Sequence, residues 1–514
     1  MQHTTPTPPT LHDGLRAVAD RHGDNLALRS GEDEVTYGEL DALVDQAAAA
    51  LAANGVGRGD RVAMMLGNRV SFVVTCYGAW RAGAAVVPIN TGLTAPEIAH
   101  ELTDCRATVL VVGRAWTDTV AELRGTLPDL EHVFVADSTQ PVAADSGMRS
   151  WRQTRAGHAQ DAPSGVEVGS SDLALLAYTS GTTGSPKAAM LTHGQLLANQ
   201  RQLTASDMGV TADDVVFTAL PLFHSYALNV AMGMAIQAGA TLELVERFEP
   251  SSALSLVSRT RVTVIEGAPP MYVAWLNTPG ADEVDLSSVR LATSGAAPLH
   301  PKVLRRCAEE LSLDIREGYG LAEASPVVAS SAALPEAVPG SVGRPLEGVE
   351  VRIIDDDHDA APGDPGLIAV RGDNVFAGYW DAPEATAQVL DADGWLHTGD
   401  IGYTDDGLLY LVDRAKDVII VSGFNVYPVE VEQALASHPD VDRAAVVGVP
   451  HPYTGEAVKA FVVRREGTEV TGEELLGHVA RRVARFKQPE TIEFVADLPT
   501  LPTGKVRRRL LRDL

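Results

Sequence analysis

Tyr178-Thr179-Ser180-Gly181-Thr182-Thr183-Gly184-Ser185-Pro186-Lys187 is the stretch around which the rest of the chain is organised. The apolar run 173–177 precedes it and predicts a buried strand. The two glycines allow the backbone to turn with its N–H groups exposed, and the hydroxyls and the lysine could face the same space. These groups suit a polyphosphate, although the spacing is not that of a Walker A loop. An ordinary turn rich in Ser, Thr and Gly has the same composition, so this stretch alone leaves both interpretations open.

The length and composition are those of a globular protein with more than one domain. The chain has 514 residues, of which 45% are hydrophobic and 21% charged, and this length exceeds what one core serves. The first ten residues contain no apolar segment, and the most apolar stretch, 71–90, is interrupted by Arg81. The three cysteines lie far apart in sequence and fit a reducing compartment. We therefore expect a cytoplasmic protein without a signal peptide or membrane span.

The charge of the chain is strongly negative and unevenly distributed. The formal net charge is −27 at pH 7, which argues against a nucleic-acid-binding protein. Residues 414–514, however, carry 15 Lys and Arg against 14 Asp and Glu. This relatively cationic end could meet an anionic ligand, but its charge equally fits an ordinary small domain.

Strands and helices alternate in two series along the first 311 residues. A capping box, Thr36 to Glu39, begins a helix. In the first series we expect strands at 61–65, 84–88, 108–112 and 132–136, and in the second at 214–219, 241–245, 262–266 and 291–294. Helices lie between them, and residues 138–171 are expected to form a connection. This spacing predicts two doubly wound, largely parallel sheets in an α/β fold.

The pattern changes near residue 340. Glycine-rich turns and short β-like runs predict a small β-rich subdomain at about 340–413. The charged segment 413–417 is a natural boundary, and a small α+β unit follows it. We therefore predict a large N-terminal domain, 1–413, which includes the β-rich subdomain, and a small C-terminal domain, 414–514.

Seven motifs in order over nearly the whole chain resemble those of the adenylate-forming enzyme superfamily, which includes acyl-CoA synthetases, firefly luciferase and peptide-synthetase adenylation domains. They are the glycine loop at 178–187, Pro-Leu-Phe-His at 221–224, Gly-Tyr-Gly-Leu-Ala-Glu at 318–323, Trp-Leu-His-Thr-Gly-Asp at 395–400, Asp-Arg-Ala-Lys-Asp at 413–417, Gly-Phe-Asn-Val-Tyr-Pro at 423–428 and Pro-Thr-Gly-Lys at 502–505. The resemblance implies that a carboxylic acid attacks the α-phosphate of ATP, giving acyl-AMP and pyrophosphate. The thiol of CoA then displaces AMP.

The resemblance also assigns residues to the nucleotide. The phosphates would be held by Thr179, Ser180, Gly181, Thr182, Thr183, Gly184 and Lys187, and the adenine by Gly295, Ala296, Ala297, Gly318, Tyr319 and Gly320. Glu323 would hold Mg²⁺, which prefers oxygen ligands, and Asp400 with Arg414 would bind the ribose. Ala322 stands where the family commonly has a threonine, which puts one hydrogen bond to the α-phosphate in doubt.

A second group of residues is implied to act on a C-terminal domain that rotates between the two half-reactions. Lys505 would bridge the attacking carboxylate and the α-phosphate, and Lys416 matches the hinge. Gly423 and Phe424 would then replace Lys505 and line the tunnel for CoA. The arginines at 507–509 could meet CoA phosphates or form a solvated tail.

The acid pocket is implied to begin at His224, the gate at the carboxylate end. Its lining would be Tyr226, Val230, Met271, Pro326 and Val327. Segment 223–226 contains no carboxylate, whereas amino-acid-activating relatives have an aspartate there, so a substrate without an α-amine is expected.

The identity of the acid and of the acceptor stays open in the sequence. Segment 423–428 resembles bacterial fatty-acid–CoA ligases, and 220–228 resembles coumarate–CoA ligases. We predict a fatty acid, with an arylpropenoic acid as the alternative. An acyl-AMP ligase that loads an acyl carrier protein, and a non-catalytic binding relative, are the rival hypotheses. A homodimer is compatible with the sequence but is not required by it.

Overall fold

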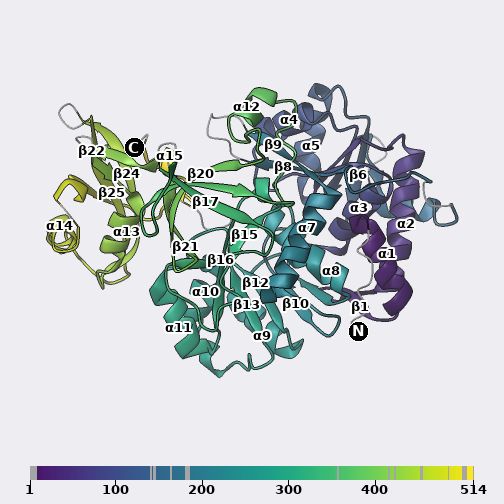
Figure 1. Ribbon diagram of the computed structural model, residues 1–514. Helices are drawn as coiled ribbons and strands as arrows, with labels where there is room; N and C mark the ends of the chain where they lie inside the picture. The colour runs from purple at the N-terminus through teal and green to yellow at the C-terminus, as the bar shows by residue number, and fades with distance from the viewer. Residues whose placement is uncertain are drawn as a thin grey trace. The chain divides into compact units, whose positions relative to one another are not determined.

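The computed structural model describes residues 9–138, 142, 146–161, 165–179, 186–355, 358–414, 417–421, 424–451, 455–483, 485–500 and 506–512 (Figure 1). The chain forms two compact units. The first comprises Met1–Pro339, Gly343–Glu350 and Arg371–Leu396, and the second Gly340–Val342, Val351–Val370 and His397–Leu514. The fold is α/β, with a large sheet-rich N-terminal part and a smaller C-terminal part, which confirms the predicted fold class.

The first unit contains a seven-stranded sheet built from the first predicted series. Its strands, in spatial order, are β7 (Arg149–Ser150), β6 (His132–Ala136), β5 (Val109–Gly113), β3 (Arg61–Met65), β4 (Ala85–Pro88), β8 (Leu173–Thr179) and β9 (Lys187–Thr192). All neighbours are parallel except β8 and β9, which are antiparallel. The buried strands are runs of Val, Ala, Leu and Met because helices cover both faces of such a sheet.

The second sheet of this unit has a parallel centre. Its strands, in spatial order, are β15 (Val327–Ser330), β14 (Ile315–Gly320), β13 (Leu291–Ser294), β12 (Val264–Gly267), β10 (Val215–Thr218), β11 (Thr241–Leu244), β1 (Leu26–Ser30) and β2 (Asp33–Thr36). The strands from β14 to β1 are parallel, and β15 and β2 are antiparallel to their neighbours. The carboxyl ends of β12, β13 and β14 therefore lie at one edge, where the sequence places several predicted site residues.

The helices of the first unit separate and cover these strands. They are α1 (Leu11–His22), α2 (Tyr37–Ala53), α3 (Val70–Arg81), α4 (Ala95–Asp104), α5 (Thr117–Leu123), α6 (Trp151–Gly157), α7 (His193–Leu203), α8 (Met234–Ala238), α9 (Pro250–Arg259), α10 (Pro269–Leu276), α11 (Pro301–Leu311) and α12 (Pro383–Ala387). The predicted capping box begins α2, with Thr36 Oγ1 accepting from the Glu39 N–H and Glu39 accepting from the Thr36 N–H.

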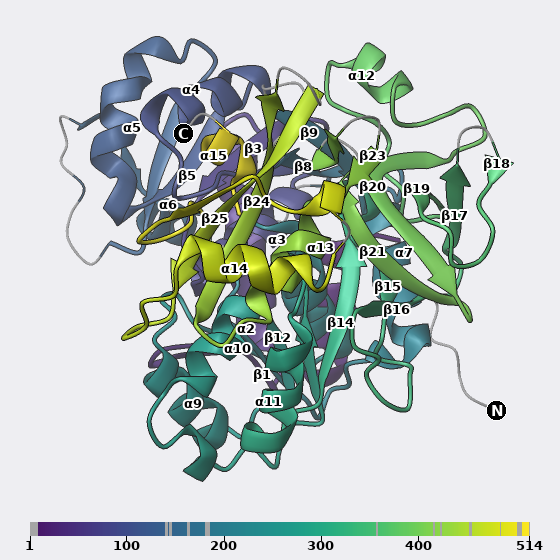
Figure 2. The ribbon, with the colours of Figure 1, turned by 90° about the vertical axis from the view of Figure 1, so that its left-hand side faces the viewer.

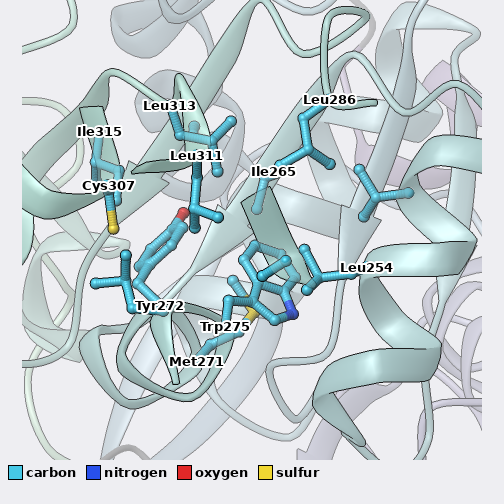
Figure 3. Packing of buried hydrophobic residues seen from close by; sticks show 14 of the residues in the cluster. Leu254, Ile265, Met271, Tyr272, Trp275, Leu286, Cys307, Leu311, Leu313 and Ile315 are labelled. Atoms are coloured by element: carbon cyan, nitrogen blue, oxygen red, sulfur yellow. The ribbon is translucent and has the colours of Figure 1, made fainter. Parts of the chain in front are cut away.

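One hydrophobic cluster packs α9, α10 and α11 against β12, β13 and β14 (Figure 3). Trp275 and Tyr272 from α10 lie at its centre, both fully buried, with Leu254 from α9 and Cys307 from α11. Each buried side chain of this size contributes about 2–3 kcal/mol by leaving water. The cluster thus fixes the helices that follow the strand ends.

The second unit consists of β-rich and α+β parts. Its strands and helices are β17 (Glu350–Asp355), β18 (His358–Asp359), β19 (Gly366–Arg371), β20 (Leu396–Asp405), β21 (Leu408–Arg414), β22 (Ile419–Val421), β23 (Phe424–Val426), α13 (Pro428–Ala436), β24 (Val441–His451), β25 (Gly455–Arg464), α14 (Gly472–Ala480), β26 (Thr491–Phe494) and α15 (Arg508–Arg512). Strands β20 and β21 form the predicted hairpin. The long β24–β25 pair carries α13 and α14 on one face (Figure 2).

The structure differs from the sequence-based prediction in three places. Residues 138–171, expected as a connection, contain α6 and the short strand β7. Strands β1 and β2, which were not predicted, extend the second sheet. The helix expected between the first two strands of the second series is π-helical over Tyr226–Gly233 and α-helical only from Met234. The compact units are defined by contacts, whereas the boundary expected at 413–414 separates parts that move relative to each other. That boundary stays a prediction.

Candidate active site

The two ends of the glycine loop lie side by side. Thr179 ends β8 and Lys187 begins β9, and the two are directly opposite each other in the antiparallel pair. The Tyr178 hydroxyl donates to Asp104 Oδ2 at 2.6 Å, which fastens the end of β8 to α4. The predicted phosphate ligands Ser180, Gly181, Thr182, Thr183 and Gly184 lie outside the described residues.

A carboxylate from a distant segment meets this loop. Glu323, in a short 3₁₀ turn over Ala322–Ala324, is 8% exposed, and its Oε1 accepts from the Tyr379 hydroxyl at 2.8 Å. The Thr179 hydroxyl donates to the same oxygen at 3.4 Å. Lys187 Nζ lies 5.7 Å from the centre of the Tyr379 ring. The structure therefore brings together the predicted residues Thr179, Lys187 and Glu323.

The residues around Glu323 suit a magnesium ion that shares its ligands with a phosphate. Among the described residues no lysine or arginine forms an ion pair with Glu323, and no group of three His, Cys, Asp or Glu side chains could hold a metal by itself. Mg²⁺ commonly binds through one or two carboxylates together with waters and substrate phosphates. A single carboxylate beside Thr179 fits the donor set of such a site.

Tyr379 was missed by the sequence analysis. It belongs to no predicted motif and follows the glycine Gly378 in an irregular segment. The backbone N–H of Met190, in β9, donates to the Gly378 carbonyl at 2.9 Å, which holds this segment beside the loop. A tyrosine in a loop is too common for its identity alone to have indicated a role.

The predicted adenine slot has unusual backbone geometry. Ala296 has a φ of +67°, in the left-handed region that L-residues rarely adopt, and such strain is often stored at functional sites. A Cβ on Gly320 would lie 1.9 Å from the Pro326 carbonyl oxygen, so only glycine fits there. Tyr319 is 7% exposed. The assignments of Gly295, Ala297, Gly318 and Tyr319 to adenine, and of Ala322 to the α-phosphate, stay predictions.

The backbones of the predicted ribose residues are paired in the second unit. Asp400 in β20 pairs with Arg414 in β21, and the Asp400 N–H donates to Thr398 Oγ1 at 3.1 Å. Asp400 is 8% exposed. Phe424 pairs with Val421 across the β22–β23 hairpin. Lys416, Gly423 and Lys505, for which roles were predicted, lie outside the described residues.

Arg508 belongs to an internal ion-pair cluster. Its guanidinium contacts Glu432 at 2.9 Å and Asp417 at 3.6 Å, and Arg512 contacts Asp417 at 3.0 Å. Arg508 is only 18% exposed and is held in this ion-pair cluster, so it is not a solvated tail residue. A contact between Arg508 and CoA phosphates stays a prediction.

The predicted acid-pocket residues come from three segments that hydrogen bonds join. Tyr226 and Val230 lie on the π-helix, and the neighbouring Asn229 donates to the Ser325 carbonyl at 2.7 Å, next to Pro326. Asn199 from α7 accepts from the Val327 N–H at 3.1 Å and donates to its carbonyl at 2.8 Å. His224 precedes the π-helix, and its Nδ1 accepts from the Tyr226 N–H at 3.4 Å.

The side chains of Tyr226 and Met271 each pack against a glycine at the edge of the second sheet. The Tyr226 ring lies against Gly295, where a Cβ would approach ring carbons to 3.1 Å, and Met271 Cε lies against Gly267, where a Cβ would approach to 2.3 Å. Gly267 is the last residue of β12, and Gly295 directly follows the neighbouring parallel strand β13. The structure thus places Tyr226 and Met271 at the same edge of the sheet, while their contact with an acid stays a prediction.

Two further observations concern the cysteines and the apolar character of the helices. Cys76, Cys105 and Cys307 are buried free thiols, in agreement with the absence of a disulfide framework. None of the described helices combines the length and the apolar character that crossing a membrane demands.

Comparisons with known proteins agree with the geometry of the site. Residues 15–380 match the family model of the AMP-binding enzyme, and residues 430–505 that of the AMP-binding enzyme C-terminal domain. Feruloyl-CoA synthase from Amycolatopsis sp is 39% identical over 491 residues, 95% of each chain. Long-chain-fatty-acid–CoA ligase from Bacillus subtilis (strain 168) is 35% identical, covering 99% of this chain and 96% of that protein.

A solved structure is similar throughout. ATP-bound MatB from Rhodopseudomonas palustris superimposes with a TM-score of 0.88 at 33% identity, covering 98% of each chain. The likeness extends over both family domains and over nearly the full length of these proteins. The chain belongs to the adenylate-forming AMP-binding enzyme family, among the acyl- and aryl-CoA ligases.

Proposed function

We propose that this protein is an ATP-dependent acid–thiol ligase that activates a carboxylic acid without an α-amine and transfers the acyl group to CoA. The observation that carries the proposal is the convergence of Thr179, Lys187 and Glu323, with Tyr379 between them. It supplies a cation, hydroxyls and a carboxylate around one loop, which is what the binding of ATP with a divalent cation requires.

In the first half-reaction a carboxylate oxygen of the acid attacks the α-phosphorus, and the bond from that phosphorus to the bridging oxygen breaks, releasing pyrophosphate. Lys187 and the hydroxyl of Thr179 would offset the charge of the phosphates, and Lys505 would hold the two anions together as they react. Glu323 would hold Mg²⁺, which supplies charge neutralisation on the phosphates. Asp400 and Arg414 would bind the ribose.

In the second half-reaction the sulfur of CoA attacks the acyl carbon, and the bond to the AMP oxygen breaks. The thiol loses its proton and AMP leaves with the pair of electrons of the broken bond. His224 would stand at the carboxylate end of the pocket. Rotation of residues 414–514 about Lys416, bringing Gly423 and Phe424 in place of Lys505, is the proposed way in which one site serves both steps.

A lysine exchange tests the adenylation step. Lys505→Ala should abolish acid-dependent pyrophosphate release, because the variant lacks the charge that bridges the two anions. Lys302→Ala, which removes an exposed lysine from α11, is the matched control and should retain the wild-type rate. Unchanged release by the Lys505 variant would contradict the catalytic assignment and favour a binding protein.

The acceptor is tested with preformed acyl-AMP. We expect a thioester with CoA and none with a phosphopantetheine-bearing carrier protein. The reverse result would replace the CoA ligase by a carrier-loading enzyme.

The acid itself is tested by pyrophosphate release with acids of graded chain length and aromatic character. The relatives include one named for feruloyl-CoA and one named for long-chain fatty acids, so they support a CoA ligase without choosing between these classes. The preference for a fatty acid, the cytoplasmic location and a possible homodimer stay predictions.

A further inference from the structure

A glutamate is buried where β12 ends. Glu266 is 2% exposed, and its Oε2 accepts a hydrogen bond from the Tyr226 hydroxyl at 2.7 Å. The Thr293 hydroxyl donates to the same oxygen, and the Tyr226 and Thr293 hydroxyls are 2.6 Å apart. Glu266 and Thr293 are direct neighbours in the parallel β12–β13 pair, so their side chains lie on the same face of the sheet.

The two oxygens of this carboxyl have different surroundings. Both hydrogen bonds end on Oε2, and among the described residues none lies within hydrogen-bonding distance of Oε1. No described lysine or arginine forms an ion pair with Glu266. Burial raises the pKa of Glu266, and this effect outweighs the two hydrogen bonds, which lower it. Because Oε2 already accepts twice, Oε1 is the oxygen that is left to bond a further polar group.

The cluster lies between two residues of the predicted acid pocket. On one side is Tyr226, two residues after His224, with its ring packed on Gly295. On the other side Glu266 is followed by Gly267, against which Met271 packs. On the other neighbouring strand the buried Thr218 is directly opposite Glu266, so polar side chains occupy three adjacent positions on this face of the sheet. Because both hydrogen bonds end on Oε2, a polar group of a ligand that reached Oε1 would complete the hydrogen bonding of this carboxyl group.

We propose that Glu266 is a specificity-determining residue at the floor of the acid pocket, where its Oε1 forms a hydrogen bond with a hydroxyl group at the end of the substrate remote from the reacting carboxylate. Tyr226 and Thr293 are positioning residues that hold Oε2 and so orient Oε1. The substrate class is then a compact acid with a distal hydroxyl group, such as an aryl hydroxyl.

This inference rests on the proposed acid–thiol ligase function. A plain alkyl chain would reach the same floor without offering a partner to Oε1. A site built to hydrogen-bond a polar group discriminates against analogues that lack it, because its own buried group is then left without a partner. The inference therefore favours the aryl alternative over the fatty acid that the sequence motifs suggested.

The test compares three acids with the wild type, Glu266→Gln and Glu266→Leu. The acids are 3-(4-hydroxyphenyl)propenoic acid, 3-phenylpropenoic acid and dodecanoic acid, and the measurement is kcat/KM for pyrophosphate release. We expect the wild type to prefer the hydroxylated acid over its unsubstituted analogue by about tenfold, the effect of one hydrogen bond. Glu266→Gln should keep this preference, because the amide accepts with its oxygen and donates with its nitrogen. Glu266→Leu should remove it or reverse it.

Tyr272→Phe is the matched control in the same cluster. The Tyr272 hydroxyl donates to the Thr293 carbonyl at 2.6 Å and has no bond to Glu266, so its removal should leave the ratio between the acids unchanged. An equal loss for all three acids in Glu266→Leu would show a purely structural role and overturn the inference. So would a wild-type enzyme that is active but prefers dodecanoic acid. Absence of pyrophosphate release with every acid would instead refute the proposed function.

Discussion

The Tyr379 hydroxyl donates a hydrogen bond of 2.8 Å to the Glu323 carboxylate, and the ring of the same tyrosine lies 5.7 Å from Lys187 Nζ. One side chain thereby contacts both charged groups that flank the phosphate loop. The phenol fixes the rotamer of Glu323, and the ring provides an apolar, weakly negative surface for the lysine. Tyr379 is in this way a positioning residue for the proposed magnesium carboxylate.

Tyr379→Phe should lower the affinity for Mg²⁺ more than it lowers the affinity for the acid. Loss of a hydrogen bond that orients a metal-binding carboxylate typically costs about tenfold or more in metal affinity. We expect the Mg²⁺ concentration for half-maximal pyrophosphate release to rise about tenfold, with little change in the KM for the acid. Titration of Mg²⁺ at saturating ATP and acid measures this shift.

Tyr77→Phe serves as the control for removing one buried hydroxyl. The Tyr77 hydroxyl is buried and has no hydrogen-bond partner in the described part of the chain, so its loss should leave both the stability and the Mg²⁺ dependence near those of the wild type. An unaltered Mg²⁺ dependence in Tyr379→Phe would remove the positioning role from Tyr379.

Gly320→Ala should destabilise the protein and impair ATP binding together. The added Cβ would lie 1.9 Å from the Pro326 carbonyl oxygen, which is a backbone atom and cannot rotate away. The Leu321 N–H donates to the same carbonyl at 2.9 Å, so any shift also breaks this bond. We expect a loss of at least about 2 kcal/mol in the free energy of unfolding, seen as a lower midpoint in urea.

Gly125→Ala is the matched substitution at an open position. No heavy atom lies within 4 Å of the Cβ that it would add, so the unfolding midpoint should stay within error of the wild type. Equal midpoints for the two alanine variants would show that the backbone near Pro326 yields without cost.

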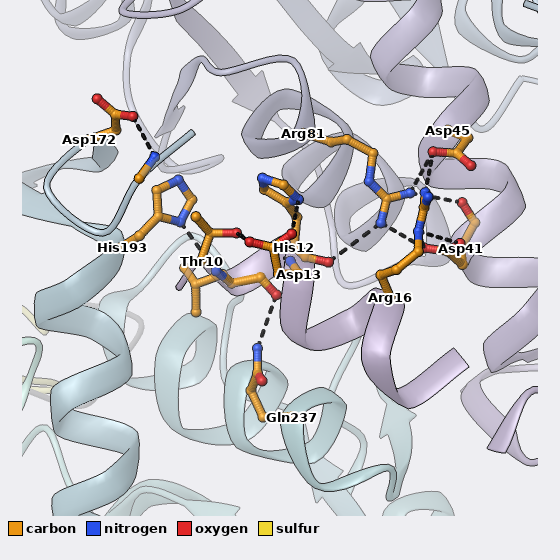
Figure 4. Close-up of polar contacts among 12 residues, drawn as sticks. Thr10, His12, Asp13, Arg16, Asp41, Asp45, Arg81, Asp172, His193 and Gln237 are labelled. Atoms are coloured by element: carbon orange, nitrogen blue, oxygen red, sulfur yellow. Dashed lines mark hydrogen bonds and ion pairs between the residues drawn. The ribbon is translucent and has the colours of Figure 1, made fainter. Parts of the chain in front are cut away.

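Acidification below pH 6.5 should destabilise the first unit through two buried histidines (Figure 4). Burial lowers the pKa of His193 to about 3, with the neighbouring His12 adding to the effect and Asp172 opposing it. Burial also lowers the pKa of His12 to about 4, against the opposing influence of Asp13. Between these values and the ordinary pKa near 6.5, the unfolded chain binds more protons than the folded chain.

The sign of the pH dependence follows from this difference. Each of the two histidines lowers the free energy of unfolding by about 1.4 kcal/mol for every pH unit below 6.5, and neither contributes a slope above that pH. In the wild type the Leu11 N–H donates to His193 Nδ1 at 3.4 Å. His193→Asn removes the titratable ring but keeps an acceptor, because the amide oxygen can take the same hydrogen bond. Urea unfolding at pH 5, 6, 7 and 8 should give a shallower acid slope for this variant, and equal slopes would refute the assignment.

The sequence by itself determined the type of chemistry and most of the elements that carry it. The apolar run before Tyr178 and the residues after it identified the loop whose ends, Thr179 and Lys187, face each other in the structure. Strands such as 61–65, 132–136 and 291–294 were predicted with their observed bounds. These features are local, because burial patterns, caps and motif residues are read from neighbours in the chain.

The tertiary structure alone decided which distant side chains meet. Tyr379 reaches Glu323, Arg508 is neutralised by Glu432, and Glu266 is joined by Tyr226 and Thr293, although no local pattern marks any of these pairs. From sequence alone a glutamate in a strand is expected to face solvent, because glutamates are rarely buried. Only the packing around it shows that it is buried and which groups contact it. The sequence therefore specified a carboxylic acid activated through ATP, whereas the choice of acid depends on contacts that only folding creates.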